Sequence, residues 1–261
     1  MNRFIKTTIV TSLIAISAYA YAADKNNHPA TTAATPAEKA KIEAVVHDYL
    51  ISKPEVLVEA MQVLQEKQFQ QAQQTVKQTQ KAAATYANDL FHQSTDPIAG
   101  NPDGKITIVE FFDYQCPHCI DMAPTMDAVI KANPDVRVIY KDFPIRGPLS
   151  ELAARAALAA QKQGKYHELS NAMLTANKQL TQDVILEIAK NQGLDVDKLK
   201  QDMKDSAIDN QLKANTKLAQ NLKLLGTPAF FIGKTSGKGN INYVPGQMDQ
   251  KQLQLMIDNN K

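Results

Sequence analysis

The chain has 261 residues, enough for one or two domains that bury a core of their own. Apolar residues make up 44% of the composition and charged residues 21%, which excludes a disordered chain. The formal net charge of +2 indicates no nucleic-acid partner. Two cysteines are too few for a disulfide scaffold or for a zinc site made of cysteines alone.

The N-terminus has the features of a signal peptide. Arg3 and Lys6 precede an apolar run over residues 9–20, and an A-x-A cleavage site ends at Ala22. The run is short for a membrane span. We therefore expect removal of residues 1–22 and export to the periplasm, with association to the outer membrane left open. A retained membrane anchor is the alternative.

A helical segment is predicted next. Residues 23–35 are expected to be a flexible leader, because they are rich in Ala, Thr, Asn and Pro. Thr35 and Glu38 then predict a capping box with proline at the first helical position. A first helix is predicted over 36–52 and a second, without a breaker, over 55–93.

The second helix has an apolar stripe with no partner of its own. Its members follow helical spacing and comprise Leu57, Met61, Leu64, Phe69, Ala72, Val76, Ala83, Tyr86 and Leu90. A lone long helix cannot bury such a stripe. We therefore predict that residues 36–93 form a dimerisation segment; packing onto the chain's own domain is the alternative. The Gln-rich tract at 65–80 is expected to be the solvated face.

A second domain is predicted from residue 94. After a linker at 94–105, strands at 106–112 and 136–141 flank a helix at 117–132, which indicates a parallel βαβ unit. A purely helical pattern then covers 150–225. Its start and stop signals predict helices from Ser150 to Gly164, from Thr181 to Gly193 and over 205–225. Strands at 229–232 and 241–244, joined by a turn, and a helix at 249–259 complete the domain. Lys141 and Asp142 end a strand, and Lys141 is expected to be solvated.

Both cysteines lie in one motif, Cys116-Pro117-His118-Cys119, where a strand ends and a helix begins. At this spacing two sulfurs can form a disulfide. So small a ring stabilises the fold little, which favours a redox role over an inert cross-link. A structural zinc site needs four ligands, and no histidine of this chain shows metal spacing. A copper site also lacks a supporting Met or His cluster.

Thiolate energetics distinguish the two sulfurs. At the first turn of a helix, unpaired N–H groups and the helix dipole favour a Cys116 anion, and His118 can favour it further. The dipole contributes at most ~2 kcal/mol, so a larger shift needs direct hydrogen bonds. Cys119, one turn further in, is expected to be more buried and less reactive. A stabilised thiolate makes the disulfide form more oxidising.

A second motif, Gly226-Thr227-Pro228, leads into an apolar strand pattern. Proline is disfavoured within a central strand because it cannot donate a backbone hydrogen bond. A cis Thr227–Pro228 bond at the start of the strand removes this difficulty. Together with the run from Val109 to Cys119 and the helical block between them, this motif resembles the DsbA family over roughly residues 95–261. The resemblance implies an α/β, thioredoxin-like fold with an inserted helical domain at about 150–225.

The resemblance also implies roles for the motif residues. Cys116 matches the nucleophile and Cys119 the resolving cysteine of a redox-active disulfide. Pro117 and His118 match the dipeptide that tunes it.

Three further residues take roles by the same resemblance. Thr227 and Pro228 match a cis-Pro loop that binds substrate backbone, and Glu110 matches a buried acid that assists proton transfer. The alternative is that Glu110 lies at a strand end and faces solvent. Because Glu110 interrupts an apolar run, we give at least equal weight to a buried side chain with a raised pKa.

The whole layout is similar to dimeric, Com-type DsbA-like proteins, because a helical segment at 36–93 precedes the domain at 94–261. We therefore expect a disulfide oxidoreductase or isomerase that acts on exported proteins with cysteines. A membrane redox partner that reoxidises or reduces the site is expected, and no cofactor or metal. The alternatives are a surface-associated assembly protein and a metal-handling protein.

Overall fold

The computed structural model describes residues 35–261, so the predicted signal peptide at 1–22 and the predicted leader up to residue 34 lie outside the described residues. The chain divides into two compact units, residues 1–62 and 63–261. Within 35–261, no helix combines the length and apolarity that a bilayer crossing requires.

The first unit contains α1 (Pro36–Ser52) and the beginning of α2 (Glu55–Thr85). The predicted capping box is present: the Thr35 hydroxyl accepts from the Glu38 amide at 3.3 Å, and the Glu38 carboxylate accepts from the Thr35 amide at 2.9 Å. No residue of α1 is buried. The large apolar side chains of α1 and of α2 up to Phe69 are exposed, apart from the half-buried Leu50 and Val56.

The end of the predicted long helix differs from the prediction. α2 stops at Thr85, and a separate short helix, α3 (Ala87–Phe91), follows. The break lets Leu90 and Phe91 enter the core of the second unit, where Ala83 is also buried. Thr79 donates to the Leu222 carbonyl at 2.9 Å. The later part of the apolar stripe thus packs onto the chain's own domain, and only the earlier part remains uncovered.

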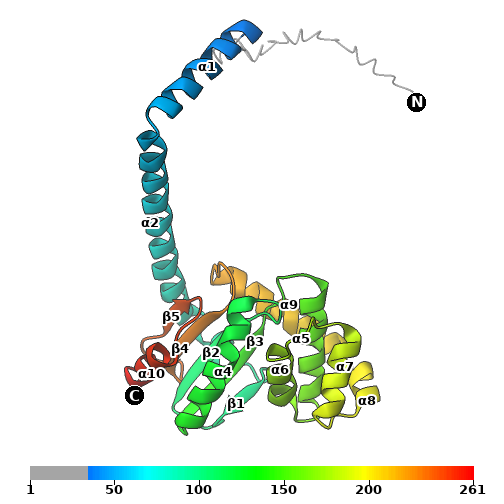
Figure 1. The fold of residues 1–261 in the computed structure, drawn as a ribbon. Helices are drawn as coiled ribbons and strands as arrows, with labels where there is room; N and C mark the ends of the chain where they lie inside the picture. The colour runs from blue at the N-terminus through cyan, green and yellow to red at the C-terminus, as the bar shows by residue number, and fades with distance from the viewer. Residues whose placement is uncertain (1–34) are drawn as a thin grey trace, which may run out of the picture. The chain divides into compact units, whose positions relative to one another are not determined.

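The second unit is built on a five-stranded sheet with the order β1-β3-β2-β4-β5 (Figure 1). Its strands are β1 (Ile98–Gly100), β2 (Ile106–Phe112), β3 (Val136–Asp142), β4 (Ala229–Lys234) and β5 (Asn242–Pro245). β2 and β3 are parallel and joined by α4 (Pro117–Ala132), which confirms the predicted βαβ unit. All other neighbours are antiparallel.

β1 lies where the sequence predicted only a linker. Its three residues pair antiparallel with β3 at the sheet edge. A segment this short has too few side chains to show a period of two, so its strand character depends on the backbone pairing that β3 offers.

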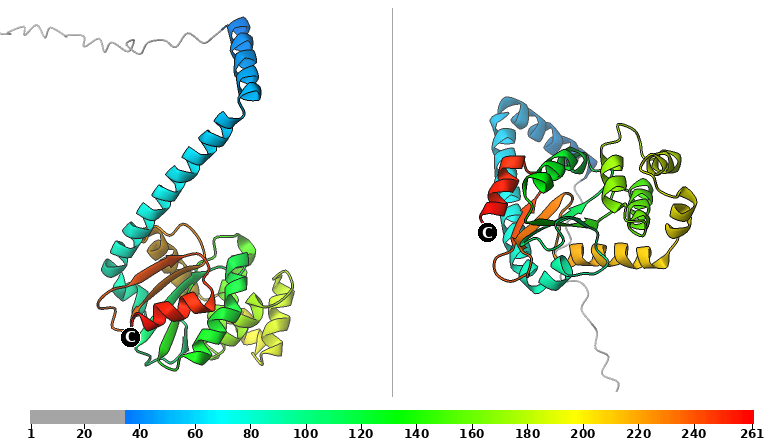
Figure 2. Two further views of the ribbon diagram at one scale, coloured as in Figure 1. Left: turned by 60° about the vertical axis from the view of Figure 1, so that its left-hand side comes forward. Right: turned by 90° about the horizontal axis from the view of Figure 1, so that it is seen from below.

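The helical block separates into five helices. They are α5 (Pro148–Gln161), α6 (Tyr166–Leu174), α7 (Gln182–Asn191), α8 (Val196–Asp202) and α9 (Ser206–Asn221). α6 follows the predicted stop at Gly164 and was not predicted as a separate helix. The last helix is α10 (Gln250–Asp258). Helices α4 and α10 pack against one side of the sheet, whereas the end of α9 packs on the other (Figures 1 and 2).

The strands of the central pair are buried on both faces. Along β2, Ile108 and Phe112 join the core cluster that contains α4, whereas Val109 and Phe111 join the cluster that contains α3. Because side chains alternate along a strand, Glu110 faces the same layer as Ile108, beneath α4. The alternation of side chains along β2 therefore places Glu110 on the face of the sheet that α4 and the cysteines cover.

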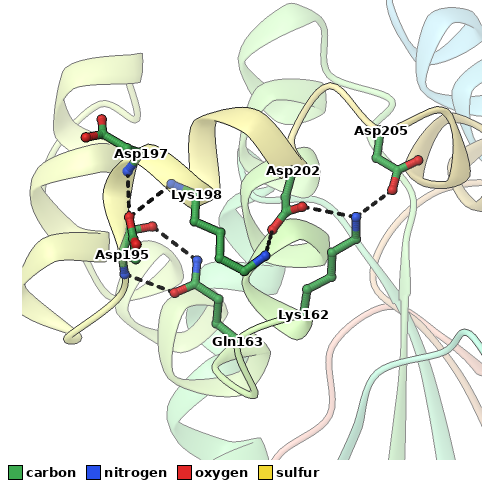
Figure 3. A network of polar contacts seen from close by, with 7 residues as sticks. All are labelled: Lys162, Gln163, Asp195, Asp197, Lys198, Asp202 and Asp205. Atoms are coloured by element: carbon green, nitrogen blue, oxygen red, sulfur yellow. Dashed lines mark hydrogen bonds and ion pairs between the residues drawn. The ribbon is translucent and has the colours of Figure 1, made fainter.

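A polar network joins the inserted helices at the surface (Figure 3). Lys162 lies 3.2 Å from Asp202 and 2.5 Å from Asp205, and Gln163 exchanges hydrogen bonds with the backbone of Asp195. Exposed pairs of this kind contribute only about 0–1 kcal/mol each. The insertion depends mainly on the alanine-rich buried face of α5.

The expectation of a solvated Lys141 is wrong. Lys141 is buried, pairs with Asp96 at 2.5 Å and donates to the Asp89 carbonyl at 2.7 Å, while Arg137 donates to the Phe91 carbonyl at 2.8 Å. The two cations thereby donate hydrogen bonds to carbonyl groups at the C-terminal end of α3, which have no partner within the helix. Burial raises the pKa of Asp96 to about 6, although Lys141 opposes the rise.

Candidate active site

The CPHC motif lies where β2 leads into α4, as predicted. Cys116 is the N-cap of α4 with extended backbone angles, and Pro117 takes the first helical position. The amides of Cys119 and Ile120 both donate to the Cys116 carbonyl at 3.0 Å. Proline suits its position because an N–H there has no partner within the helix.

The Thr227–Pro228 segment lies against Cys116. The Cys116 thiol donates to the Thr227 carbonyl, with 3.2 Å between sulfur and oxygen, and the Thr227–Pro228 peptide bond is cis, as expected. The two motifs meet because β4 pairs with β2, with Ala229 opposite Phe111. The residues that precede β4 therefore lie beside those that follow β2.

The two thiols have opposite electrostatic environments. Burial alone would raise the pKa of Cys116, but hydrogen bonds with the side chain of Thr227 and with the backbone and side chain of Cys119, together with the positive charge of Arg146, lower it below the ordinary value. Burial and the neighbouring Glu110 carboxyl raise the pKa of Cys119 far above its ordinary value. The exposed surface of Cys116 and Cys119 does not distinguish them, because both side chains are buried. The expected difference in their reactivity comes from the groups around each sulfur.

His118 is exposed on the first turn of α4. Its Nδ1 lies 2.8 Å from the Gln247 side-chain oxygen, so the loop before α10 orients the ring. Gln247 was not predicted, because a contact across 129 positions leaves no local signal in one sequence.

Glu110 is buried, with 4% of its surface exposed. Burial raises the pKa of its carboxyl from 4.5 to about 8. It lines a small cavity together with Cys119. The solvent-facing alternative for this acid is therefore wrong.

Asp113 is a site residue that the sequence analysis missed. One carboxylate oxygen accepts from the Gln115 amide at 2.7 Å and the Ser150 hydroxyl at 2.6 Å; the other accepts from the amides of Ile145 and Arg146 at 2.7 and 2.9 Å. Asp113 thus holds the loop before Cys116, the loop that carries Arg146 and the start of α5 together. An aspartate directly after a buried strand is the signal that could have indicated it.

The comparisons with known proteins agree with this geometry. Residues 107–258 match the DSBA-like thioredoxin domain. The chain belongs to the DsbA-like thioredoxin domain family. Residues 38–71 match the N-terminal domain of the copper resistance protein ScsC.

Solved structures extend the likeness beyond the DsbA-like domain. BcfH of Salmonella enterica Typhimurium is 33% identical, with a TM-score of 0.64, and the match covers 86% of this chain and 96% of that one. A linker-deletion mutant of Proteus mirabilis ScsC is 27% identical, with a TM-score of 0.62, and the match covers 88% and 98%.

Curated relatives match over a shorter stretch. A probable disulfide bond formation protein D of Bacillus cereus is 28% identical over 158 residues, 56% of this chain and 73% of that protein. The chain spans only 23% of the length of a Salinispora tropica Na(+)/H(+) antiporter, NhaA 3, to which it is 26% identical over 149 residues. The family and these structures indicate thiol–disulfide oxidoreductase activity for the DsbA-like domain.

Proposed function

We propose that this protein is a periplasmic thiol–disulfide oxidoreductase that forms or isomerises disulfide bonds in exported proteins. The observation that carries the proposal is the contrast between the two sulfurs: Cys116 has a lowered pKa at the start of α4, whereas Cys119 has a raised one beside Glu110. A thiolate is the attacking form in disulfide exchange, so Cys116 is the nucleophile and Cys119 the resolving thiol.

Each direction of the reaction passes through a mixed disulfide on Cys116. A substrate thiolate attacks the Cys116 sulfur of the oxidised protein, and Cys119 leaves. In the other direction the Cys116 thiolate attacks a substrate disulfide, and Cys119 resolves the product. Thr227 and Pro228 lie where substrate backbone can bind beside the mixed disulfide, and the lowered pKa of Cys116 favours the reduced state, which makes the protein an oxidant.

Equilibration with glutathione buffers tests this activity. We expect a reversible Cys116–Cys119 disulfide and catalysed refolding of a reduced or scrambled disulfide protein. Cys116→Ser should abolish both, whereas Cys119→Ser should trap mixed disulfides. If the wild-type chain exchanges no disulfide with glutathione, the proposal fails.

Export is proposed from the sequence of residues 1–22. A periplasmic thioredoxin-like protein of Salmonella enterica serovar Typhimurium, whose structure is solved, is 26% identical to this chain. Fractionation of cells that express the full chain should place the processed protein in the periplasm. Retention of the unprocessed chain in the inner membrane would favour the anchor alternative.

The helical segment is proposed to pair with a second copy of the chain. Support comes from large apolar side chains that are half or more exposed: Val45 on α1 and Leu57, Met61 and Phe69 on α2. Phe69→Glu should lower the mass measured by light scattering, whereas Gln68→Glu adds the same charge at the neighbouring exposed position and should leave the mass unchanged. An unchanged mass in both variants would refute pairing through this stripe.

Oxidation and isomerisation can be separated by shortening the helical segment. Because Thr79 and Ala83 are buried in the second unit, the deletion should end before them, at residue 69. We expect the shortened chain to lose isomerisation and to gain oxidation. As a monomer it carries a single CPHC site, which a reoxidising membrane partner can reach.

Metal handling is a second candidate because residues 38–71 match a domain named for copper resistance. Two thiolates are suitable ligands for Cu(I). Within residues 35–261, no group of three or more His, Cys, Asp or Glu side chains could hold a metal ion. Titration of the reduced chain with Cu(I), with Cys116→Ser as control, measures this binding directly.

A further inference from the structure

A small cavity lies behind the cysteines, between β2, α4 and α6. Its lining includes Glu110, Cys119, Tyr140, Asp127 and His167, and it has room for about one water molecule. These are the titratable groups that face Glu110: Cys119 and Asp127 from α4, Tyr140 from β3 and His167 from α6. The cavity therefore joins the buried acid and the buried sulfur to a pair of polar side chains.

The Asp127–His167 pair lies at the solvent side of this cavity. His167 Nε2 is 3.2 Å from Asp127 Oδ1, and Asn171 donates to the other Asp127 oxygen at 2.7 Å. The His167 ring stacks on Tyr140 with 6.0 Å between centroids. The His167 and Asp127 side chains are 35% and 25% exposed, so this pair contacts bulk water whereas Glu110 and Cys119 do not.

The position of the pair differs from that of the substrate. Asp127 is eight residues beyond Cys119 on α4, which is about 12 Å along the helix axis. A polypeptide joined to Cys116 would lie at the start of α4, because Cys116 is the N-cap of that helix. A proton of Cys119 then needs a route that does not pass the substrate.

We propose that the Asp127–His167 pair is the outlet through which Glu110 exchanges protons with solvent during disulfide exchange at Cys119. This inference rests on the proposed function. Both residues act through Glu110 and do not touch the reacting sulfurs, so they are positioning residues of a proton path.

The step balances as follows when glutathione is the partner. Glu110, which is neutral at rest, first releases its proton to solvent through the cavity and His167. Its carboxylate then takes the proton of the Cys119 thiol, and the Cys119 thiolate attacks the Cys116 sulfur. The Cys116–Cys119 bond forms, the bond between Cys116 and glutathione breaks, and glutathione leaves as a thiolate that takes a proton from solvent. Glu110 is left protonated, as it was at the start, and the proton that it first released has passed to solvent by way of His167.

Single-turnover oxidation of the full-length reduced protein by oxidised glutathione tests this path in weakly buffered solution. His167→Gln should slow resolution of the mixed disulfide about tenfold, less than the ~10²–10⁴-fold that an acid–base group in contact with the reacting atom contributes. Imidazole should restore the rate, because a small base can replace the lost outlet. His47→Gln, on exposed α1, is the matched control and should react as the wild type does.

Two further variants make the result decisive. Asp127→Asn should reproduce the slowing if His167→Gln does not fold. Glu110→Gln combined with His167→Gln should be no slower than Glu110→Gln alone, since both act in one path. Wild-type rates in His167→Gln and Asp127→Asn, with no response to imidazole, overturn the outlet and leave the oxidoreductase activity intact. A wild-type chain that does not exchange disulfides overturns both.

Discussion

Replacing Glu110 by glutamine should stabilise the reduced protein in a pH-dependent manner. The carboxyl has a pKa near 4.5 when unfolded and about 8 in the folded chain, because burial penalises its charge. Between these two values the unfolded state releases a proton that the folded state retains. Rising pH therefore destabilises the wild type through this window, and the glutamine variant escapes the effect.

The magnitude follows from the same two values. At about 1.4 kcal/mol for each pH unit, the full difference between 4.5 and about 8 is worth about 5 kcal/mol above pH 8. Glu110 is 4% exposed, so solvent screening reduces this little. Below pH 4.5 both proteins carry a neutral group here, and their free energies of unfolding should converge.

Urea denaturation of both reduced proteins at a series of pH values measures this difference. Asp96 and Asp142, whose pKa values burial also raises, contribute equally to both proteins and cancel in the comparison. A free-energy difference that stays constant from pH 4.5 to pH 8 would refute the assignment of a neutral, buried Glu110.

Three more outcomes are expected. Ultraviolet thiolate titration should show Cys116 ionising below the ordinary cysteine range, and Arg146→Gln should raise that pKa while Cys116→Ser removes the transition. Lys141→Met should lower the free energy of unfolding by about 3–5 kcal/mol, because Asp96 stays buried without a partner; adding Asp96→Asn should recover most of the loss in denaturant titrations. Thr79→Val should cost about 1–3 kcal/mol in the same assay, and no loss would show that its hydrogen bond to the domain is dispensable.

Local patterns in the sequence determined much of this protein. The capping box at Thr35, the βαβ unit around α4 and the placement of Cys116 at a helix start all depend on residues within a few positions of one another. Such short-range preferences act wherever the chain folds, so they are readable without a structure. The sequence also marked Glu110 as unusual, because an acid interrupts an apolar strand.

The tertiary structure decided what distant segments do to each other. The burial of Lys141 against Asp96 and the separation of α3 from α2 depend on the opposite sheet face, which no local pattern describes. The role of Asp113 and the cavity that joins Glu110 to His167 likewise require elements from different parts of the chain to meet. Burial and hydrogen-bond partners are properties of that packing, and they alone set the charge of a buried group.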